Sequence, residues 1–312
     1  MSSRQALSCF MASVVFSAMA GGVAEAQWSL LAPGDRAPAP GQNLYYMLVL
    51  ANPIPGMEND FNDWYTNLML GDLSQVAGFE GAQRFRIVSD AGLNPRPSVA
   101  GYEKGYLTIW GQRGPNNFPI NKLMVDSLEG GKVSHGAGFD YHGFGTPGVG
   151  GSYQAMGPRI SSGKKPFMPA ATDLKTRRRD RYIVMDLSNP ASGKENEFER
   201  AMDQHIKDVL ALPGWMAAQR FKVVPTFPDE KIDSSVLRYL TVWEVEGTSQ
   251  QAPEDRPARP GQSGNRVNQI QTALTAAIKN GKVNKLPIDE ATWQFTYWEP
   301  ITPYVTRALY ER

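Results

Sequence analysis

Asn189–Phe221 reads NPASGKENEFERAMDQHIKDVLALPGWMAAQRF, and Asn52–Phe85 reads NPIPGMENDFNDWYTNLMLGDLSQVAGFEGAQRF. Both stretches begin with Asn-Pro, pass a glycine and an acidic run, place a phenylalanine, and end on Gly-aromatic-x-x-Ala-Gln-Arg-Phe. A second match follows each copy, because Tyr106–Trp110 (YLTIW) corresponds to Tyr239–Trp243 (YLTVW). Matches in the same order indicate a tandem duplication, whose unit is longer than the roughly 20–50 residues of a solenoid repeat.

Each copy carries a pattern of short apolar runs and amphipathic stretches that predicts strand, helix, strand, strand, helix, strand. Acidic first turns at Glu58 and Glu195 favour helix starts there, and Gly78 and Gly214 favour helix ends. The predicted elements of the first copy are Tyr45–Ala51, a helix from Glu58, Ala82–Val88, Tyr106–Trp110, Ile120–Leu128 and Tyr153–Met156. Those of the second copy are Tyr182–Leu187, a helix from Glu195, Ala217–Val224, Tyr239–Trp243, Val267–Lys279 and Trp293–Trp298.

This order of elements is that of the ferredoxin-like βαββαβ unit, in which both helices cover one face of an antiparallel sheet. The other sheet face has to be buried elsewhere, since each Å² of apolar surface left in water costs about 25 cal/mol. Two such units in one chain can press these faces together. We therefore predict an α+β fold: two ferredoxin-like repeats forming an intrachain α/β barrel, with helices outside and a cavity between the sheets.

The run Asn-Pro…Gly…Glu…Phe-Asn-x-Trp-Tyr…Asp-Leu…Gly-Phe…Ala-Gln-Arg-Phe of the first copy resembles the EthD-like branch of the dimeric α/β-barrel superfamily, and the resemblance covers both halves of the chain. It implies a barrel that binds a small aromatic or polyketide-like molecule. The activity that it implies is a lyase, isomerase or cyclase reaction without a cofactor. The alternative is a non-catalytic ligand-binding or accessory protein, because barrels of this kind host many chemistries.

The N-terminal residues have the features of a secretory signal peptide. Arg4 precedes a largely apolar run, and Ala24-Glu25-Ala26 is a small-x-small cleavage site, so we expect residues 1–26 to be removed. The expected location is periplasmic or secreted, with no membrane association after cleavage. The remaining divisions are an N-terminal extension (27–44), a first repeat with a Gly-rich loop (45–165), a linker (166–180) and a second repeat (181–312).

Charge and cysteine content restrict the classes of partner. The formal net charge of +1 does not indicate nucleic-acid binding. The only cysteine, Cys9, lies in the predicted signal peptide, so disulfides and thiol catalysis are excluded for the mature chain. We expect a small aromatic or apolar molecule as partner, and either a monomer acting as a pseudo-dimer or a homodimer.

His205 is the strongest candidate for catalysis. It lies on the apolar face of the predicted first helix of the second copy, with Asp208 one turn later, and EthD-like proteins typically carry a histidine on this helix. A histidine oriented by a carboxylate suits general acid–base chemistry. A packed structural histidine is the alternative. Met69 stands at this place in the first copy. The second copy is one residue shorter between its Phe and its His, so we expect its first helical turn to be set differently.

Aromatic residues form the candidate ligand-binding set. Strand alternation puts Tyr, Thr and Trp of each YLT[I/V]W motif on one face and the aliphatic residues on the other. If the aliphatic face packs under the helices, Tyr106, Trp110, Tyr239 and Trp243 line the barrel interior and suit a flat apolar ligand. Filling of the inter-sheet core is the alternative.

Arg84 and Arg220 occupy matching strands, and an inward guanidinium would bind a carboxylate or enolate, whereas an outward one would be a surface cation. No metal site or cofactor is predicted. His135 and His142 have a spacing that matches no standard zinc pattern, and the Gly-x-x-Asp-Gly motif of dye-decolourising peroxidases, which would support haem, is absent.

Overall fold

The computed structural model describes residues 38–88, 105–131, 139–141, 151–163, 181–247 and 262–309. The elements of the first half are β1 (Asn43–Pro53), α1 (Glu58–Trp64), the π-helical turn η1 (Tyr65–Met69), α2 (Leu70–Ser74), β2 (Phe79–Ile87), β3 (Tyr106–Gly114), α3 (Phe118–Glu129), β4 (Phe139–Tyr141), β5 (Ser152–Ala155) and β6 (Ile160–Ser161). Those of the second half are β7 (Arg181–Ser188), α4 (Glu195–Leu210), β8 (Trp215–Val224), β9 (Tyr239–Glu246), α5 (Gln262–Lys279), β10 (Gln294–Pro300) and the short 3₁₀ turn η2 (Arg307–Leu309).

Eight antiparallel strands close into a barrel. The order β3-β2-β10-β7-β9-β8-β5-β1 returns to its start because β1 also pairs with β3. Within the first half the strand order is β5-β1-β3-β2, and within the second it is β10-β7-β9-β8. The halves meet at two seams, where β10 pairs with β2 and β5 pairs with β8. The predicted mixed α+β barrel is therefore confirmed as an architecture.

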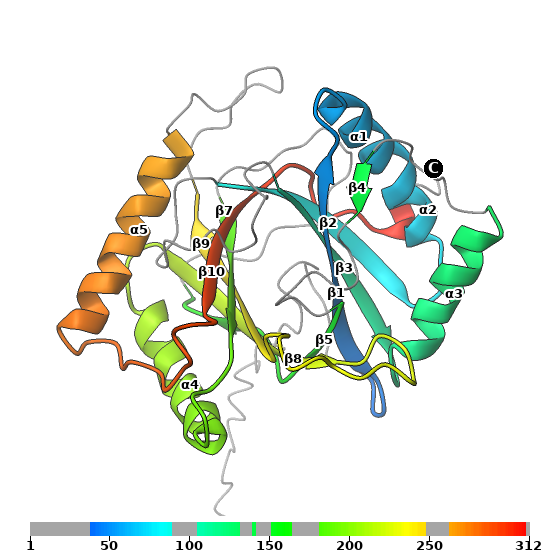
Figure 1. The fold of residues 1–312 in the computed structure, drawn as a ribbon. Coiled ribbons are helices and arrows are strands. Elements are labelled where there is room, and N and C mark those ends of the chain that lie inside the picture. Colours follow the sequence, from blue (N-terminus) through cyan, green and yellow to red (C-terminus); the bar gives the residue numbers. More distant parts are fainter. Residues whose placement is uncertain are drawn as a thin grey trace, which may run out of the picture.

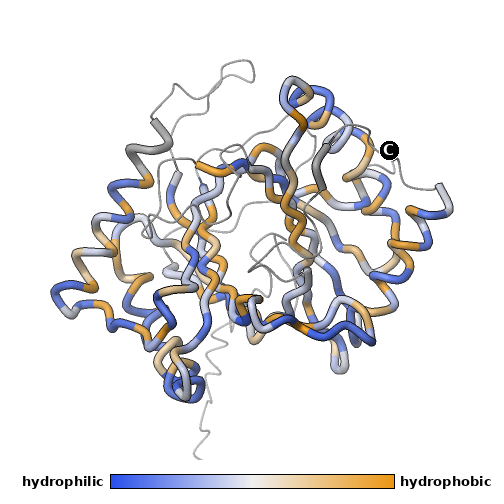
Figure 2. The backbone as a smooth tube through the Cα atoms, viewed as in Figure 1, coloured by the Kyte–Doolittle hydropathy of each residue, from blue (hydrophilic) through white to orange (hydrophobic). Residues whose placement is uncertain are grey.

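Three hydrophobic clusters fill the spaces between these layers. One contains residues of both halves, such as Leu48, Phe85, Leu187 and Phe221, and occupies the barrel interior. A second lies between α4, α5 and the strands of the second half, and a third between the helices and strands of the first half. Figure 1 shows the two helical layers on opposite sides of the barrel, and Figure 2 shows hydrophobic residues concentrated along the strands between them.

The strands are hydrophobic on both faces because both faces are covered. In β7 the side chains of Ile183, Met185 and Leu187 point into the barrel, whereas Tyr182 and Val184 pack under the helices. Such a strand reads as a continuous apolar run rather than as an alternation. A polar residue within it is therefore conspicuous. On its helix side β7 has Ser188 at its end and the acidic Asp186 within the apolar run, and Asp186 is 5% exposed.

The predicted orientation of the YLT[I/V]W motifs is wrong. Tyr106 and Trp110 belong to the cluster under the first-half helices, and Tyr239 and Trp243 to the cluster under α4 and α5. The aliphatic neighbours, such as Leu107, fill the barrel. Ring size does not decide the orientation, because the barrel interior also contains aromatic side chains such as Tyr46 and Trp298. Both faces of these strands are covered, so alternation alone leaves open which face meets the helices.

The extra residue of the first copy lies in the middle of its first helix, where Tyr65–Met69 form the π-helical turn. The prediction that it would alter the first turn is therefore wrong. A π-turn absorbs one inserted residue while the helix on either side keeps its register with the sheet. This keeps Phe61 and Leu73 in the same hydrophobic cluster despite the insertion.

Among the described residues, no helix is long and apolar enough to cross a membrane. The predicted signal peptide, the linker 166–180, His135 and His142 lie outside the described residues.

Candidate functional site

A cavity of about 100 Å³ lies in the second half, between α4, α5 and the outer face of the sheet. It is therefore outside the barrel and not between the two sheets, where we expected a binding site. Its walls are mostly hydrophobic, with a few polar groups. The lining residues are Asp186, Ser188, His205, Val209, Trp215, Trp243, Leu274, Ile278, Lys285, Leu286, Ile288, Glu290, Trp293 and Phe295.

His205 is one of the lining residues and is 7% exposed. Its Nδ1 lies 2.8 Å from the backbone oxygen of Asn284, in the segment that follows α5. A carbonyl oxygen can only accept, so Nδ1 carries the proton and donates it to this bond. Burial lowers the pKa of His205, opposed by the Asn284 carbonyl and by the charge of Asp208. The neutral ring consequently has its lone pair on Nε2, which is available as an acceptor or a base.

Asp208 does not orient His205 by a hydrogen bond, contrary to prediction. Its Oδ1 accepts a hydrogen bond of 2.7 Å from Gln204 on the exposed side of α4. Residues one turn apart share a helix face only approximately, and here His205 turns under the helix while Asp208 stays at its edge. The backbone of Asn284 takes the orienting role that we assigned to the carboxylate.

Asp186 is the second polar group in the cavity, and sequence analysis missed it. Trp293 donates its indole N–H to Oδ1 over 2.7 Å, and Trp243 donates more weakly to Oδ2 over 3.4 Å. Burial raises the pKa of Asp186 to about 6, although both indole donors lower it. The signal that could have revealed it is a single acidic residue inside the apolar run RYIVMDLS.

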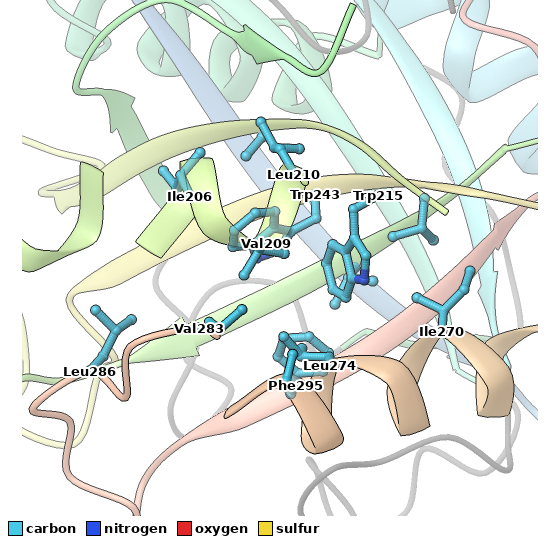
Figure 3. Packing of buried hydrophobic residues seen from close by; sticks show 14 of the residues in the cluster. Ile206, Val209, Leu210, Trp215, Trp243, Ile270, Leu274, Val283, Leu286 and Phe295 are labelled. Atoms are coloured by element: carbon cyan, nitrogen blue, oxygen red, sulfur yellow. The ribbon is translucent and has the colours of Figure 1, made fainter. Parts of the chain in front are cut away.

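Aromatic rings form most of the wall around these two groups. Trp215 meets Trp243 edge to face with ring centroids 5.1 Å apart, and His205 meets Trp243 at 6.2 Å in a similar geometry. Trp293 packs in the same way on Phe295 at 5.6 Å. Figure 3 shows Trp215 and Trp243 between the labelled residues of α4, such as Val209, and those of α5, such as Leu274.

Two polar atoms close to the cavity have no protein acceptor. The indole N–H of Trp215, a lining residue, has no hydrogen-bond partner among the described residues, and neither has the hydroxyl of Tyr297. Burial and then the negative charge of Asp186 raise the pKa of Tyr297, so the hydroxyl stays protonated. The Trp215 N–H is thus a donor that a bound molecule could satisfy.

Lys285 and Glu290 line the outer part of the cavity. Both side chains are mostly exposed, and they form an ion pair with each other. They therefore contribute little net charge to the interior. The deeper part of the cavity has one ionisable acid, Asp186, and one neutral base, His205.

The matching layer of the first half is built differently. Arg84 is 0% exposed there, and its guanidinium donates to Asn62 Oδ1 over 2.8 Å and to Thr66 Oγ1 over 2.7 Å. It also lies over the rings of Tyr65 and Tyr106, at 4.5 and 5.7 Å from their centroids. Burial lowers the pKa of Arg84 to about 10. The inward orientation considered for this arginine is wrong, since it points to the helix layer.

Arg220 also points to the helix layer, where it bonds to Asp203 of α4 over 3.0 Å. Tyr239 donates to Glu199 over 2.6 Å at the same edge. Of the residues predicted to bind ligand, Trp243 lines the cavity, and Tyr106, Trp110, Tyr239, Arg84 and Arg220 do not. The structure therefore brings together His205 and Trp243, and adds Asp186, Trp215 and Trp293.

Within the described residues, no three His, Cys, Asp or Glu side chains lie close enough to hold a metal ion.

No family model and no curated protein matches this chain. Solved structures with a similar arrangement include an anthrone oxidase-like protein, with 12% identity and a TM-score of 0.40, covering 84% of this chain and 93% of that one. Another is chlorite dismutase from Candidatus Nitrospira defluvii in complex with imidazole, with 9% identity and a TM-score of 0.41, covering 82% of this chain and 91% of that one. Likenesses of this size say nothing about activity.

Proposed function

We propose that this protein binds a small, largely apolar molecule, aromatic or polyketide-like, in the cavity between α4 and α5, and that His205 transfers a proton to or from it. The reaction class would be a lyase, isomerase or cyclase reaction without a cofactor, as the EthD-like resemblance implies. In this proposal Asp186, and not Asp208, is the carboxyl group that assists.

The observation that carries the proposal is the composition of this one cavity. A hydrophobic hollow with a few convergent polar groups and shifted pKa values is the usual form of a small-molecule site. Here burial raises the pKa of Asp186 to about 6 and lowers the pKa of His205 below its ordinary value, so the two pKa values move towards each other. A pair of this kind can exchange protons with a ligand at little cost.

Volume limits what can enter. About 150 Å³ holds one benzene molecule in a protein interior, whereas this cavity has about 100 Å³. A single ring or a short branched group therefore fills the deep part after small adjustments. The rest of a larger, polyketide-like ligand would extend past Lys285 and Glu290 towards solvent.

Binding can be tested with benzyl alcohol as a neutral probe in isothermal titration calorimetry. We expect a dissociation constant of about 1 mM or tighter, which eight non-hydrogen atoms can supply. Ile278→Trp should block the cavity, because Ile278 lines it from α5 and is partly exposed. Leu123→Trp, an exposed position on α3 of the first half, is the control and should bind normally. Equal binding by both variants would move the site elsewhere.

Proton transfer needs the natural ligand, which native mass spectrometry of the purified protein can identify if it is retained. On that molecule or its precursor, His205→Gln should lower turnover by about 10²–10⁴-fold with a much smaller change in affinity, the usual share of a positioned acid or base. Met69→His in the first half should not restore activity, since Val49 stands there in place of Asp186. Full turnover by His205→Gln would leave the second candidate, a non-catalytic binding protein.

We further propose that the chain is an EthD-like protein that arose by duplication of a ferredoxin-like unit and acts as a pseudo-dimer. The strand orders β5-β1-β3-β2 and β10-β7-β9-β8 support this, because they place corresponding strands in the same sequence. Export after cleavage behind Ala26 is also a proposal, resting on Arg4 and Ala24-Glu25-Ala26. N-terminal sequencing of the exported protein should then begin at Gln27, and a product beginning at Met1 or Ser2 would contradict it.

A further inference from the structure

Asp186 carries a charge that nothing in the described protein neutralises. Its oxygens accept hydrogen bonds from Trp293 and Trp243, both of which are neutral donors. The cation of the outer cavity, Lys285, is paired with Glu290. Buried carboxylates are normally paired with a cation, because removing an isolated charge from water is costly. The carboxylate of Asp186 is already removed from water in the free protein, so a bound cation would not have to displace water from it.

The surroundings of Asp186 favour a cation over other partners. Indole rings attract a positive charge through their faces, more strongly than other aromatic side chains do, and three tryptophans line this cavity. His205 adds a second acceptor, because its proton on Nδ1 is committed to Asn284 and its Nε2 is free to accept. Ser188, which is 3% exposed, adds a hydroxyl.

An anion would fit poorly. It would meet the Asp186 carboxylate in a space where the unpartnered donor is the indole N–H of Trp215. A neutral alcohol could donate one hydrogen bond to Asp186, but it would leave the charge uncompensated. A protonated amine satisfies both requirements, since an ammonium group has three donors and no acceptor.

We propose that the cavity binds the ammonium group of a small amine with a compact apolar body, and that Asp186 is its counter-ion and His205 Nε2 an additional acceptor. This inference rests on the proposed small-molecule site and specifies its ligand class. The apolar body lies against Trp215, Trp243 and Phe295, and the amine reaches the carboxylate. Any larger substituent extends past the exposed lining residues Lys285 and Glu290.

The test compares three probes of nearly the same shape by isothermal titration calorimetry at pH 7.5: benzylamine, benzyl alcohol and benzoate. We expect benzylamine to bind at least tenfold more tightly than benzyl alcohol, and benzoate to bind least. Asp186→Asn should bring the ratio of benzylamine to benzyl alcohol affinity close to one. Asp208→Asn is the matched control, because it also removes one negative charge, but from a position on α4 outside the cavity. The ratio of the two affinities should stay at its wild-type value in this variant.

Salt provides a second control. The affinity for benzylamine should change less than twofold between 50 and 500 mM NaCl, because a buried pair is poorly screened. A large drop would assign the preference to exposed carboxylates such as Glu290 and overturn the proposal.

The outcomes separate the two levels of inference. If benzyl alcohol binds as tightly as benzylamine to the unmodified protein, the cavity binds small molecules but the ammonium assignment is wrong. If no probe binds while thermal unfolding shows an intact fold, the proposed site itself fails, and this inference fails with it. Because the wild-type ratio alone decides between these outcomes, the test does not depend on whether Asp186→Asn folds.

Discussion

The two halves of this barrel have the same helix-on-sheet layer, but different residues fill it. Val49 pairs with Thr108 in the first half, and at the matching register Asp186 pairs with Thr241 in the second. Both layers contain a tryptophan at the end of the YLT[I/V]W motif. The first-half layer holds a buried arginine, Arg84, and a buried amide pair, Gln112 and Asn121. The second-half layer holds a carboxyl, an imidazole and a cavity.

The difference indicates that the fold tolerates a cavity and buried polar groups in a helix layer, because the barrel interior supplies a core that both halves share. Residues of both halves pack inside the barrel, so one helix layer can keep buried polar groups and a hollow at the expense of local stability. Buried polar groups usually cost stability and are retained where they serve a function. The proposed site in the second half is consistent with this view, because its polar groups line a cavity.

The largest expected difference between the halves concerns their first helices, and removing one residue from each of these helices tests it. Deleting Leu68, an exposed residue of the π-turn, should leave a regular α-helix and cost less than about 2 kcal/mol. Deleting Lys207 from α4 should cost more than about 4 kcal/mol, since the following residues rotate by about 100° and Val209 leaves the buried face. Urea unfolding followed by circular dichroism measures both. Equal effects would mean that the π-turn does not hold the extra residue.

The second compares the two arginines. Arg84→Ala should lower the free energy of unfolding by about 3 kcal/mol. It leaves a cavity among the rings of Phe61, Tyr65 and Tyr106, and unpaired acceptors on Asn62 and Thr66. Arg220→Ala should cost about 1 kcal/mol or less, since its partner Asp203 has a side chain that is 69% exposed. Chemical denaturation at pH 7.5 checks the pair, and a larger loss at Arg220 would reverse our ranking of the two layers.

The third prediction concerns the buried carboxyl group that only the second half has at this register. The folded pKa of Asp186, about 6, lies above its ordinary value of 3.8, so the folded protein holds this proton more tightly than the unfolded chain does. The stabilisation is full below pH 4 and is lost as the pH rises through 6. Relative to Asp186→Asn, the wild type should therefore lose about 2–3 kcal/mol between pH 4 and 7, at about 1.4 kcal/mol per pKa unit.

The difference between the two proteins is measured by urea unfolding at several pH values, and any packing cost of the amide cancels because it does not vary with pH. Asp208→Asn should run parallel to the wild type. A parallel course for Asp186→Asn would show that the carboxyl is not destabilised by burial.

The fourth and smallest effect concerns His205. Burial lowers its folded pKa, so the stability due to its neutral form is present above the unfolded pKa of 6.5 and is lost as the pH falls through the folded value. His205→Gln should cost about 1 kcal/mol at pH 7.5 through the altered bond to Asn284. As the pH falls below 6.5, this difference should shrink. Nuclear magnetic resonance titration of the three histidines gives the pKa directly, and a value above 6.5 would contradict the burial argument.

Much of the fold was predictable from the sequence because duplicated motifs and apolar runs are local signals. The helix starts at Glu58 and Glu195 are confirmed, as is the barrel architecture. The facing of YLTIW and YLTVW was not predictable, since both strand faces are buried and alternation alone does not say which face meets the helices. His205 could be singled out from its asymmetry with Met69. Asp186 was missed because its two indole donors come from β9 and from the segment before β10, which only the tertiary fold brings together.

The seam between β10 and β2 has a consequence for synthesis. Strand β2 is complete more than 200 residues before its partner β10 emerges, and the segment after β10 adds a bridge from Val305 to Ala82. Gly81 makes room for it, because a Cβ atom there would lie 2.3 Å from the Val305 oxygen. During translation the edge of β2 that pairs with β10 therefore stays unpaired while most of the chain is synthesised. An early release of the nascent chain would leave an open sheet edge, which is a template for pairing with other chains.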